Sequence, residues 1–256
     1  MITPSFDQFS KGYKEGKNQV LFAKIPADLE TPVSLFLKLA NNRKNCFLLE
    51  SVTGGEDRGR YSILGMDPDL IWQCNDNSSF VTWMDGFDQI PSHTPETEDP
   101  FLSLRFLIKA SSIDLPSHLP ASSSGLFGYL SYDMVRLVEN LPQNNPDTIG
   151  TPDAILLRPS LIAVLDGVLD ELNLVCPVWY NENIEAETAY KTGIERLEKT
   201  LNTLQNITFN YSSRHTKAGP SAKLVNEIPK EEVLAMIRKA KTYIREGDIF
   251  QVVPSQ

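Results

Sequence analysis

The sequence has little cysteine and no cysteine cluster. Its three cysteines are Cys46, Cys74 and Cys176. They lie far apart, each in or beside an apolar stretch, and their spacing lacks the CxxC or Cys/His arrangement of a metal site. We therefore expect buried free thiols and a reducing compartment.

Long apolar runs are also absent. The N-terminus lacks the uninterrupted apolar core of a signal peptide, and the strongest apolar stretch, residues 154–169, is interrupted by Arg158, Pro159 and Asp166. This pattern argues against a membrane protein. We expect a cytoplasmic protein.

Basic residues are too few for a protein that binds phosphate backbones. The sequence has 24 Lys and Arg against 33 Asp and Glu, which gives a formal charge of −9. No block of five or more like charges interrupts this balance. Neither nucleic acid nor an anionic membrane is an expected partner.

Three segments carry helix signals. Thr31 and Pro32 form an N-cap and first helical position before apolar residues at helical spacing, and "EDPFLSLRFLIKA" repeats this opening with Asp and Pro. In the segment 185–204, the apolar residues are spaced four, three, four and three residues apart, which aligns them on one face. Each segment is therefore predicted to be an amphipathic helix.

The strand signals are short and paired. "CFLLES", "GRYSILG", "DLIWQCN" and "SFVTWMD" read as strands, and the turn residues "DNS" predict a hairpin between the last two. "SLIAVL" and "LNLVCPVW" form a second hairpin candidate. Hairpins without regular βαβ alternation indicate an α+β fold rather than a dinucleotide-binding domain.

The sequence changes character after residue 207, and a new element follows. Residues 208–227 lose apolar periodicity and are predicted to be a linker. A helix is predicted between Pro229 and Gly247, followed by the strand "DIFQVV". The predicted buried stripe of this helix is Val233, Ile237, Ala240 and Ile244. Because a domain ending on an unpaired strand leaves edge hydrogen bonds open, we expect the sequence to be truncated.

The stretch "LLESVTGGEDRGRYSILG" places Glu50 and Ser51 where an apolar strand stops. From periodicity alone, the simpler interpretation is a strand end, in which Glu50 reaches water and Ser51 bonds the turn led by Gly54 and Gly55. A glycine-rich phosphate loop is an alternative, but the Walker spacing and the GxGxxG pattern are missing.

A second glycine-punctuated stretch, "GLFGYLSYDMVRLVENLP", is predicted to be structural. Gly125 and Gly128 would permit close backbone approach. The expected core residues are Phe127, Tyr129, Leu130 and Val135. The polar residues Tyr132, Asp133 and Arg136 are predicted to form a buried hydrogen-bonded cluster.

Read together, "FLLESVTGGEDRGRYSILGMDP", "GLFGYLSYDMVRLVENLP" and "EEVLAMIRKAKTYIREGDIFQVVPSQ" resemble three signature segments of the anthranilate synthase component I family of chorismate-utilising enzymes, in the same order. The resemblance implies an α+β fold of two packed antiparallel β layers with surrounding helices, truncated in this sequence. It further implies an N-terminal regulatory lobe over residues 1–215. Residues 216–256 would be a linker plus the first helix and strand of the chorismate-binding catalytic domain.

The resemblance also implies an activity for the intact protein. Chorismate and ammonia would become anthranilate and pyruvate in tryptophan biosynthesis, with tryptophan as feedback inhibitor. Mg²⁺ would be bound by ligands in the missing C-terminal half, and a glutamine amidotransferase subunit would supply ammonia within a hetero-oligomer. The present sequence alone would be inactive.

Four residues receive roles from the resemblance. Leu49, Glu50 and Ser51 would line the tryptophan pocket, with Glu50 or its carbonyl as acceptor and Ser51 as donor to the carboxylate. This role for Ser51 is favoured over turn bonding once the resemblance is included. Gln251 stands where relatives that add water to chorismate carry Lys, which favours ammonia as nucleophile and makes Gln251 the catalytic candidate.

Two alternatives stay open. Aminodeoxychorismate synthase component I, of the folate pathway, shares the pocket and the partner type but attacks a different ring position. A non-catalytic amino-acid-binding regulatory module would bind the amino acid without chemistry. The downstream reading frame would distinguish this regulatory module from an enzyme.

Overall fold

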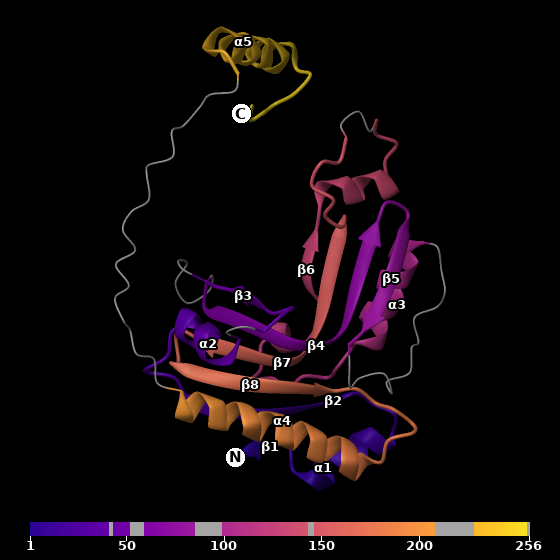
Figure 1. The fold of residues 1–256 in the computed structure, drawn as a ribbon, viewed down its shortest axis with the longest axis vertical. Helices are drawn as coiled ribbons and strands as arrows, with labels where there is room; N and C mark the ends of the chain where they lie inside the picture. Colours follow the sequence, from indigo (N-terminus) through magenta and orange to yellow (C-terminus); the bar gives the residue numbers. More distant parts are fainter. Residues whose placement is uncertain (41–42, 52–58, 85–98, 143–145, 208–227, 255–256) are drawn as a thin grey trace. The chain divides into compact units, whose positions relative to one another are not determined.

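The computed structural model describes residues 1–40, 43–51, 59–84, 99–142, 146–207 and 228–254 (Figure 1). The chain divides into two units, Met1–Thr208 and Phe209–Gln256. The predicted linker over residues 208–227 lies outside the described residues.

The described residues of the first unit form an antiparallel sheet of eight strands. Their order is β1-β2-β8-β7-β4-β3, with β5 also paired to β4 and β6 also paired to β7. The strands are β1 Ile2–Thr3, β2 Gln19–Pro26, β3 Phe47–Leu49, β4 Tyr61–Asn75, β5 Ser78–Trp83, β6 Phe127–Leu130, β7 Ala154–Asp166 and β8 Glu171–Val178. The antiparallel α+β class and both predicted hairpins, β4–β5 and β7–β8, are confirmed.

Two long strands, β4 and β7, run through the whole sheet (Figure 1). Where their register shifts between Pro68 and Leu70, their outer neighbours change. Beyond the shift lies the four-stranded limb, β5-β4-β7-β6, and before it the six-stranded limb, β1-β2-β8-β7-β4-β3. In the described residues, the two layers expected from the resemblance are therefore two limbs of one sheet.

The prediction of separate strands over "GRYSILG" and "DLIWQCN" is wrong, since both belong to β4. Asp67 and Pro68 look like strand breakers in the sequence. Asp67 does adopt a positive φ of 48°. Pairing with β7 on both sides nevertheless keeps β4 continuous, with only a local irregularity at these residues.

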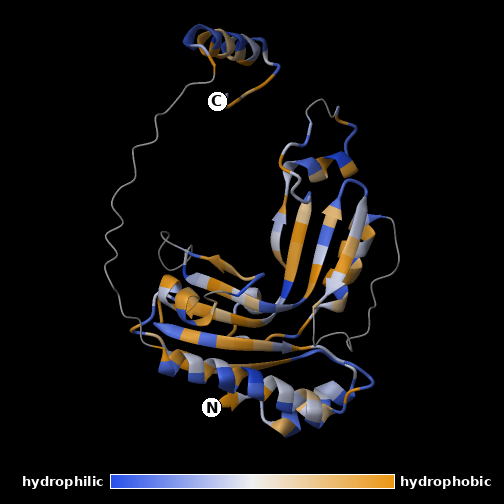
Figure 2. Cartoon of the chain, viewed as in Figure 1, coloured by the Kyte–Doolittle hydropathy of each residue, from blue (hydrophilic) through white to orange (hydrophobic). Residues whose placement is uncertain are grey.

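Helices cover one face of the six-stranded limb. They are α1 Phe6–Lys14, α2 Pro32–Leu39 and α4 Ala186–Asn206. Thr31 caps α2 as predicted, because its side chain accepts a hydrogen bond from the Ser34 amide at 3.0 Å. The apolar face of α4 packs into the largest core cluster, where Leu197 is fully buried. Figure 2 shows the corresponding pattern, with mainly hydrophobic strands and a mixed surface on α4.

A separate core supports the four-stranded limb. Helix α3, Pro100–Ala110, packs Leu104 and Leu107 against Leu70 and Trp72 of β4. Its predicted Asp-Pro opening is confirmed, since the Asp99 carboxylate accepts from the first amides of the helix. Two short 3-10 helices are η1 Ala121–Ser123 and η2 Tyr132–Leu137. Met134 of η2 belongs to the core of the four-stranded limb.

A buried ion pair lies where the limbs meet. Arg158 of β7 donates from Nε to Asp69 Oδ1 at 2.8 Å and from Nη2 to Asp69 Oδ2 at 2.8 Å. Arg158 Nη1 donates to the hydroxyl of Ser111, the C-cap of α3, at 3.1 Å. The guanidinium also lies over the ring of Trp179 at 4.2 Å. This cluster joins β4, β7, α3 and the chain after β8.

The segment around β6 differs from its prediction. Tyr129 and Leu130 are 41% and 54% exposed, because β6 is an edge strand. Met134 is the buried residue of the short helix η2. The predicted core position is therefore wrong for Tyr129 and Leu130, whereas Phe127 is partly buried and packs against a core cluster. The predicted buried polar cluster is also wrong. Tyr132 is 78% exposed, and the ion pair between Asp133 and Arg136 lies at the surface.

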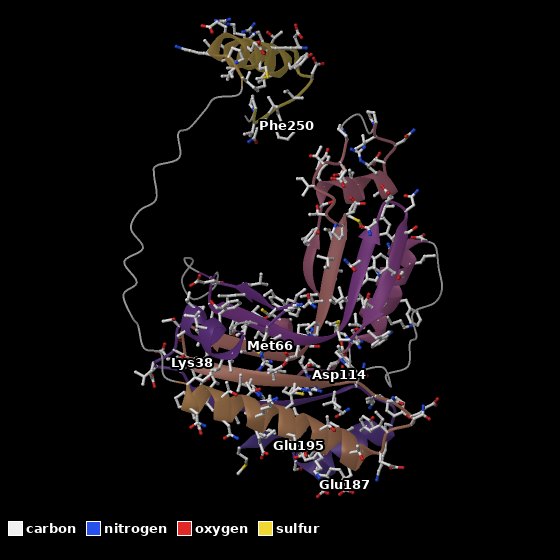
Figure 3. The ribbon with its side chains drawn as sticks, in the orientation of Figure 1. Lys38, Met66, Asp114, Glu187, Glu195 and Phe250 are labelled. Carbon is white, nitrogen blue, oxygen red and sulfur yellow. The ribbon has the colours of Figure 1, made fainter. Side chains whose placement is uncertain are left out.

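The second unit contains α5, Lys230–Glu246. Its predicted end is confirmed, since Gly247 adopts the left-handed conformation with φ 84°. The predicted buried stripe and the strand over 248–253 are wrong for the described residues. None of the helix is buried, and Phe250 in the following segment is 95% exposed (Figure 3). A strand needs a hydrogen-bonded neighbour and an apolar stripe needs a packing surface, and the described part of this unit supplies neither.

Candidate functional site

The predicted site residues Leu49, Glu50 and Ser51 follow one another in the chain from the last residue of β3. Figure 1 labels this strand. This strand is the edge of the six-stranded limb and pairs with β4, with Leu49 opposite Ile63. Alternate residues of a strand face opposite sides, and paired residues share a side. Leu48 therefore faces the helix-covered core, and Leu49 faces the other side.

This other side, the inner face of the six-stranded limb, is apolar near the site. One row of paired residues runs across it from Leu49 through Ile63 and Val164 to Asn173. Val164 is fully buried, whereas Leu49 at the edge is 52% exposed. Leu49 thus offers an accessible apolar contact next to a covered apolar surface.

Ser51 is fixed by hydrogen bonds to the start of β4. Its hydroxyl donates to the Tyr61 carbonyl at 2.8 Å, and its amide donates to the Ser62 hydroxyl at 3.1 Å. The hydroxyl thus bonds a backbone carbonyl, as the strand-end interpretation of Ser51 expects. The carbonyl belongs to Tyr61, whereas that interpretation named the turn at Gly54 and Gly55. The predicted turn at Gly54 and Gly55 lies outside the described residues.

The hydrogen bond to Tyr61 changes what Ser51 can offer a ligand. A hydroxyl has one donor hydrogen and two acceptor lone pairs. Because the hydrogen is directed to the Tyr61 carbonyl, the oxygen is left as an acceptor. In this arrangement Ser51 suits an ammonium group rather than the carboxylate predicted from the sequence.

Arg60 and Asp166 form an ion pair next to these residues. Arg60 Nε and Nη2 donate to the two Asp166 carboxylate oxygens at 2.9 and 2.6 Å. Asp166 also accepts the amides of Val168 and Leu169 in the β7–β8 turn. Burial raises the pKa of Asp166, but the hydrogen bonds from Arg60 and the turn amides outweigh it and hold the pKa below its ordinary value. The ionised carboxylate thus anchors the chain as it enters β4.

No local sequence pattern indicates this ion pair, because its partners are 106 residues apart. Gln251, the predicted catalytic candidate, lies in the second unit. It is exposed in the segment that follows α5. The structure therefore brings Leu49, Glu50 and Ser51 together, and it assigns Gln251 to a different unit.

The described residues contain no cluster of metal-ligating side chains. Among them, no three His, Cys, Asp or Glu side chains are grouped so that they could hold a metal ion.

In the described ranges, no helix has the length and apolar character needed to cross a membrane. The cysteines Cys46, Cys74 and Cys176 are free, the last two buried.

Comparison with known proteins identifies a family and several relatives. Residues 44–256 match the model of the chorismate binding enzyme family. The chain is 47% identical to anthranilate synthase component 1 of Cereibacter sphaeroides over 98% of this chain and 50% of that protein. It is 31% identical to the protein of the same name from Acetivibrio thermocellus over 100% of this chain and 51% of that one.

A solved structure, anthranilate synthase component I of Streptococcus pneumoniae, matches 88% of this chain and 46% of its own, with a TM-score of 0.48 and 22% identity. The chain spans about half the length of the curated relatives that it matches.

Proposed function

The chain belongs to the chorismate binding enzyme family, and we propose that the intact protein is component I of anthranilate synthase. The observation that supports this most directly is the 47% identity to a protein of that name over 98% of the chain. Because the chain spans about half of such relatives, the activity is proposed for the intact protein. The present 256-residue chain alone is expected to be inactive.

The proposed reaction is a carbon–oxygen lyase reaction in tryptophan biosynthesis. Ammonia adds to the chorismate ring as the ring hydroxyl leaves, and pyruvate is then eliminated so that the ring becomes aromatic. A glutamine amidotransferase subunit would supply the ammonia within a hetero-oligomer, and Gln251 would position it. Mg²⁺ would hold the chorismate dianion through residues outside the described ranges, and the protein would work in the cytoplasm.

We further propose that residues 1–215 form a regulatory lobe and that tryptophan binds at the end of β3. The Ser51 hydroxyl and Glu50 would accept hydrogen bonds from its ammonium group, and Leu49 would contact the indole. Support comes from the acceptor state of the Ser51 oxygen and from the exposed apolar surface of Leu49. Residues 216–256 would begin the catalytic domain.

The test uses the intact protein with chorismate, Mg²⁺ and ammonium salt, and follows anthranilate fluorescence with and without tryptophan. Anthranilate formation that tryptophan suppresses is the expected result. An aminated chorismate that retains its pyruvyl group would instead identify aminodeoxychorismate synthase. Binding of tryptophan without any product would identify a non-catalytic regulatory module.

The site is tested by Ser51→Phe, which should keep turnover and abolish tryptophan inhibition. Ser117→Phe is the matched control, because Ser117 is an exposed residue in a turn of the same unit. Equal loss of turnover and inhibition in Ser51→Phe would argue against a regulatory site at this serine.

A further inference from the structure

The ring of Phe47 covers Gly65 on the inner face, and Phe47 lies two residues before Leu49. Phe47 is paired with Gly65 of β4. A Cβ atom at Gly65 would lie 2.2 Å from Phe47 Cε1, so the ring occupies the space that any other residue would need. The same Cβ would meet Pro159 of β7 at 3.0 Å. The ring therefore reaches from the edge strand β3 across β4.

The Phe47 ring also stacks on the ring of Phe127, which belongs to β6. The two ring centroids are 4.7 Å apart with an interplanar angle of 25°, a stacked arrangement. Strand β3 pairs with β4 and β6 pairs with β7, so these strands flank opposite sides of the central pair. The stack joins the two edge strands across the inner face, and with them the two limbs of the sheet.

Strand β3 depends on such a contact. It has three residues and three pairs with β4, and an edge strand lacks hydrogen bonds on its outer side. Its side-chain contacts must therefore contribute much of what holds it in place. Phe47 supplies one on the inner face, and Leu48 packs on the opposite face against the main core. Leu49 and Ser51 follow directly in the chain, so their positions depend on the same anchor.

We propose that Phe47 and Phe127 are positioning residues of the tryptophan site. Their stack holds β3 against β4, so that Leu49 and the Ser51 oxygen are presented in a fixed arrangement. Phe127 belongs to another strand and another limb, and it is not one of the residues proposed to contact tryptophan. This inference rests on the proposed function and adds the residues that set the affinity for the inhibitor.

The experiment compares Phe127→Leu with wild type in the intact protein. The readouts are kcat and KM for chorismate, the tryptophan inhibition constant and the tryptophan Kd from calorimetry. Phe127→Leu should raise both tryptophan constants about tenfold, which corresponds to about 1.4 kcal/mol. Because neither ring is among the residues proposed to act on chorismate or ammonia, kcat and KM should stay within about twofold. Phe127→Tyr keeps the ring and should keep wild-type affinity.

Phe22→Leu is the matched control. Phe22 lies on the same inner face, in β2, where its ring contacts His118 at 4.9 Å rather than the stack. It should leave the tryptophan constants within about twofold of wild type. Phe47→Leu removes the stack from the other side and gives a second measurement if Phe127→Leu fails to fold.

Three outcomes would overturn the positioning role. They are unchanged tryptophan binding in Phe127→Leu, an equal loss of affinity in Phe22→Leu, and a fall in kcat as large as the fall in affinity. A wild-type protein that makes anthranilate but neither binds nor responds to tryptophan would refute the proposed inhibitor site and this inference with it. A wild type that binds tryptophan, with unaffected variants, would refute the positioning role alone.

Discussion

Replacing Arg158 by Met should destabilise the first unit by about 3–5 kcal/mol. The variant keeps the length of the side chain but removes the charge that faces Asp69. The Asp69 side chain is fully buried and the Arg158 side chain is 4% exposed, so water cannot replace the lost partner. Ser111 loses the guanidinium that donates to its hydroxyl.

The size of this effect follows from the asymmetry of buried ion pairs. Removing one partner leaves an unpaired buried charge, which costs about 3–5 kcal/mol, whereas replacing both by apolar residues of similar size is often close to neutral. Arg158→Met combined with Asp69→Leu should therefore recover most of the loss. For a unit of this size, the single variant should lower Tm by about 6–20 °C.

Urea unfolding, monitored by tryptophan fluorescence, measures the loss in free energy of unfolding with probes close to the ion pair. All three tryptophans of the sequence are described, and two of them, Trp83 and Trp179, lie within 5.6 and 4.2 Å of the Arg158 guanidinium carbon. A single variant that costs less than about 1 kcal/mol would contradict the argument, as would a double variant no more stable than the single one.

The cost should also depend on pH. Burial raises the pKa of Asp69, and Arg158 offsets part of that rise. Without Arg158 the pKa must rise further. A carboxyl group with a raised pKa in the folded state favours folding at low pH, and this contribution is lost as pH rises through that pKa. The destabilisation by Arg158→Met should therefore be smaller at about pH 5 than at about pH 8. An equal cost at both would contradict this sign.

Three further outcomes are expected. Thr31→Ala removes the cap of α2 and should cost about 1 kcal/mol in urea unfolding, and an unchanged midpoint would show that the cap contributes nothing. Gly128→Ala should cost about 3 kcal/mol, because its Cβ would lie 1.9 Å from a carbonyl oxygen of β7; full stability would contradict the close pairing of β6 with β7. At about pH 8, a thiol reagent should label Cys46 first, since burial raises the pKa of Cys74 to about 11 and also raises that of Cys176. Labelling of all three at one rate would contradict these burials.

The elements that could be predicted are those whose signals are local. Thr31 and Asp99 each precede a proline and cap a helix, and Gly247 ends one, because capping involves residues a few positions apart. The hairpin turns also depend on neighbouring residues. Leu49 and Ser51 lie together in the structure for the simple reason that they are two residues apart in the chain.

The features that could not be predicted depend on partners far away in the sequence. The continuity of β4 through Pro68 is decided by β7, and the Asp69–Arg158 pair joins residues 89 apart. The exposure of Tyr129 depends on β6 being at an edge, which its apolar pattern does not reveal. The hydrogen-bonding state of Ser51 likewise depends on the Tyr61 carbonyl across the strand pair.

The sheet order also has a consequence for synthesis on the ribosome. Strand β2 pairs along its whole length with β8, whose residues emerge roughly 150 positions later. At about 5–20 residues per second, the nascent chain spends about 8–30 s with β2 made but β8 absent. Leu21 and Phe22, almost completely buried in the finished sheet, face water or a chaperone during that interval. We therefore expect the six-stranded limb to close late, after α3 and the β4–β5 hairpin have left the ribosome.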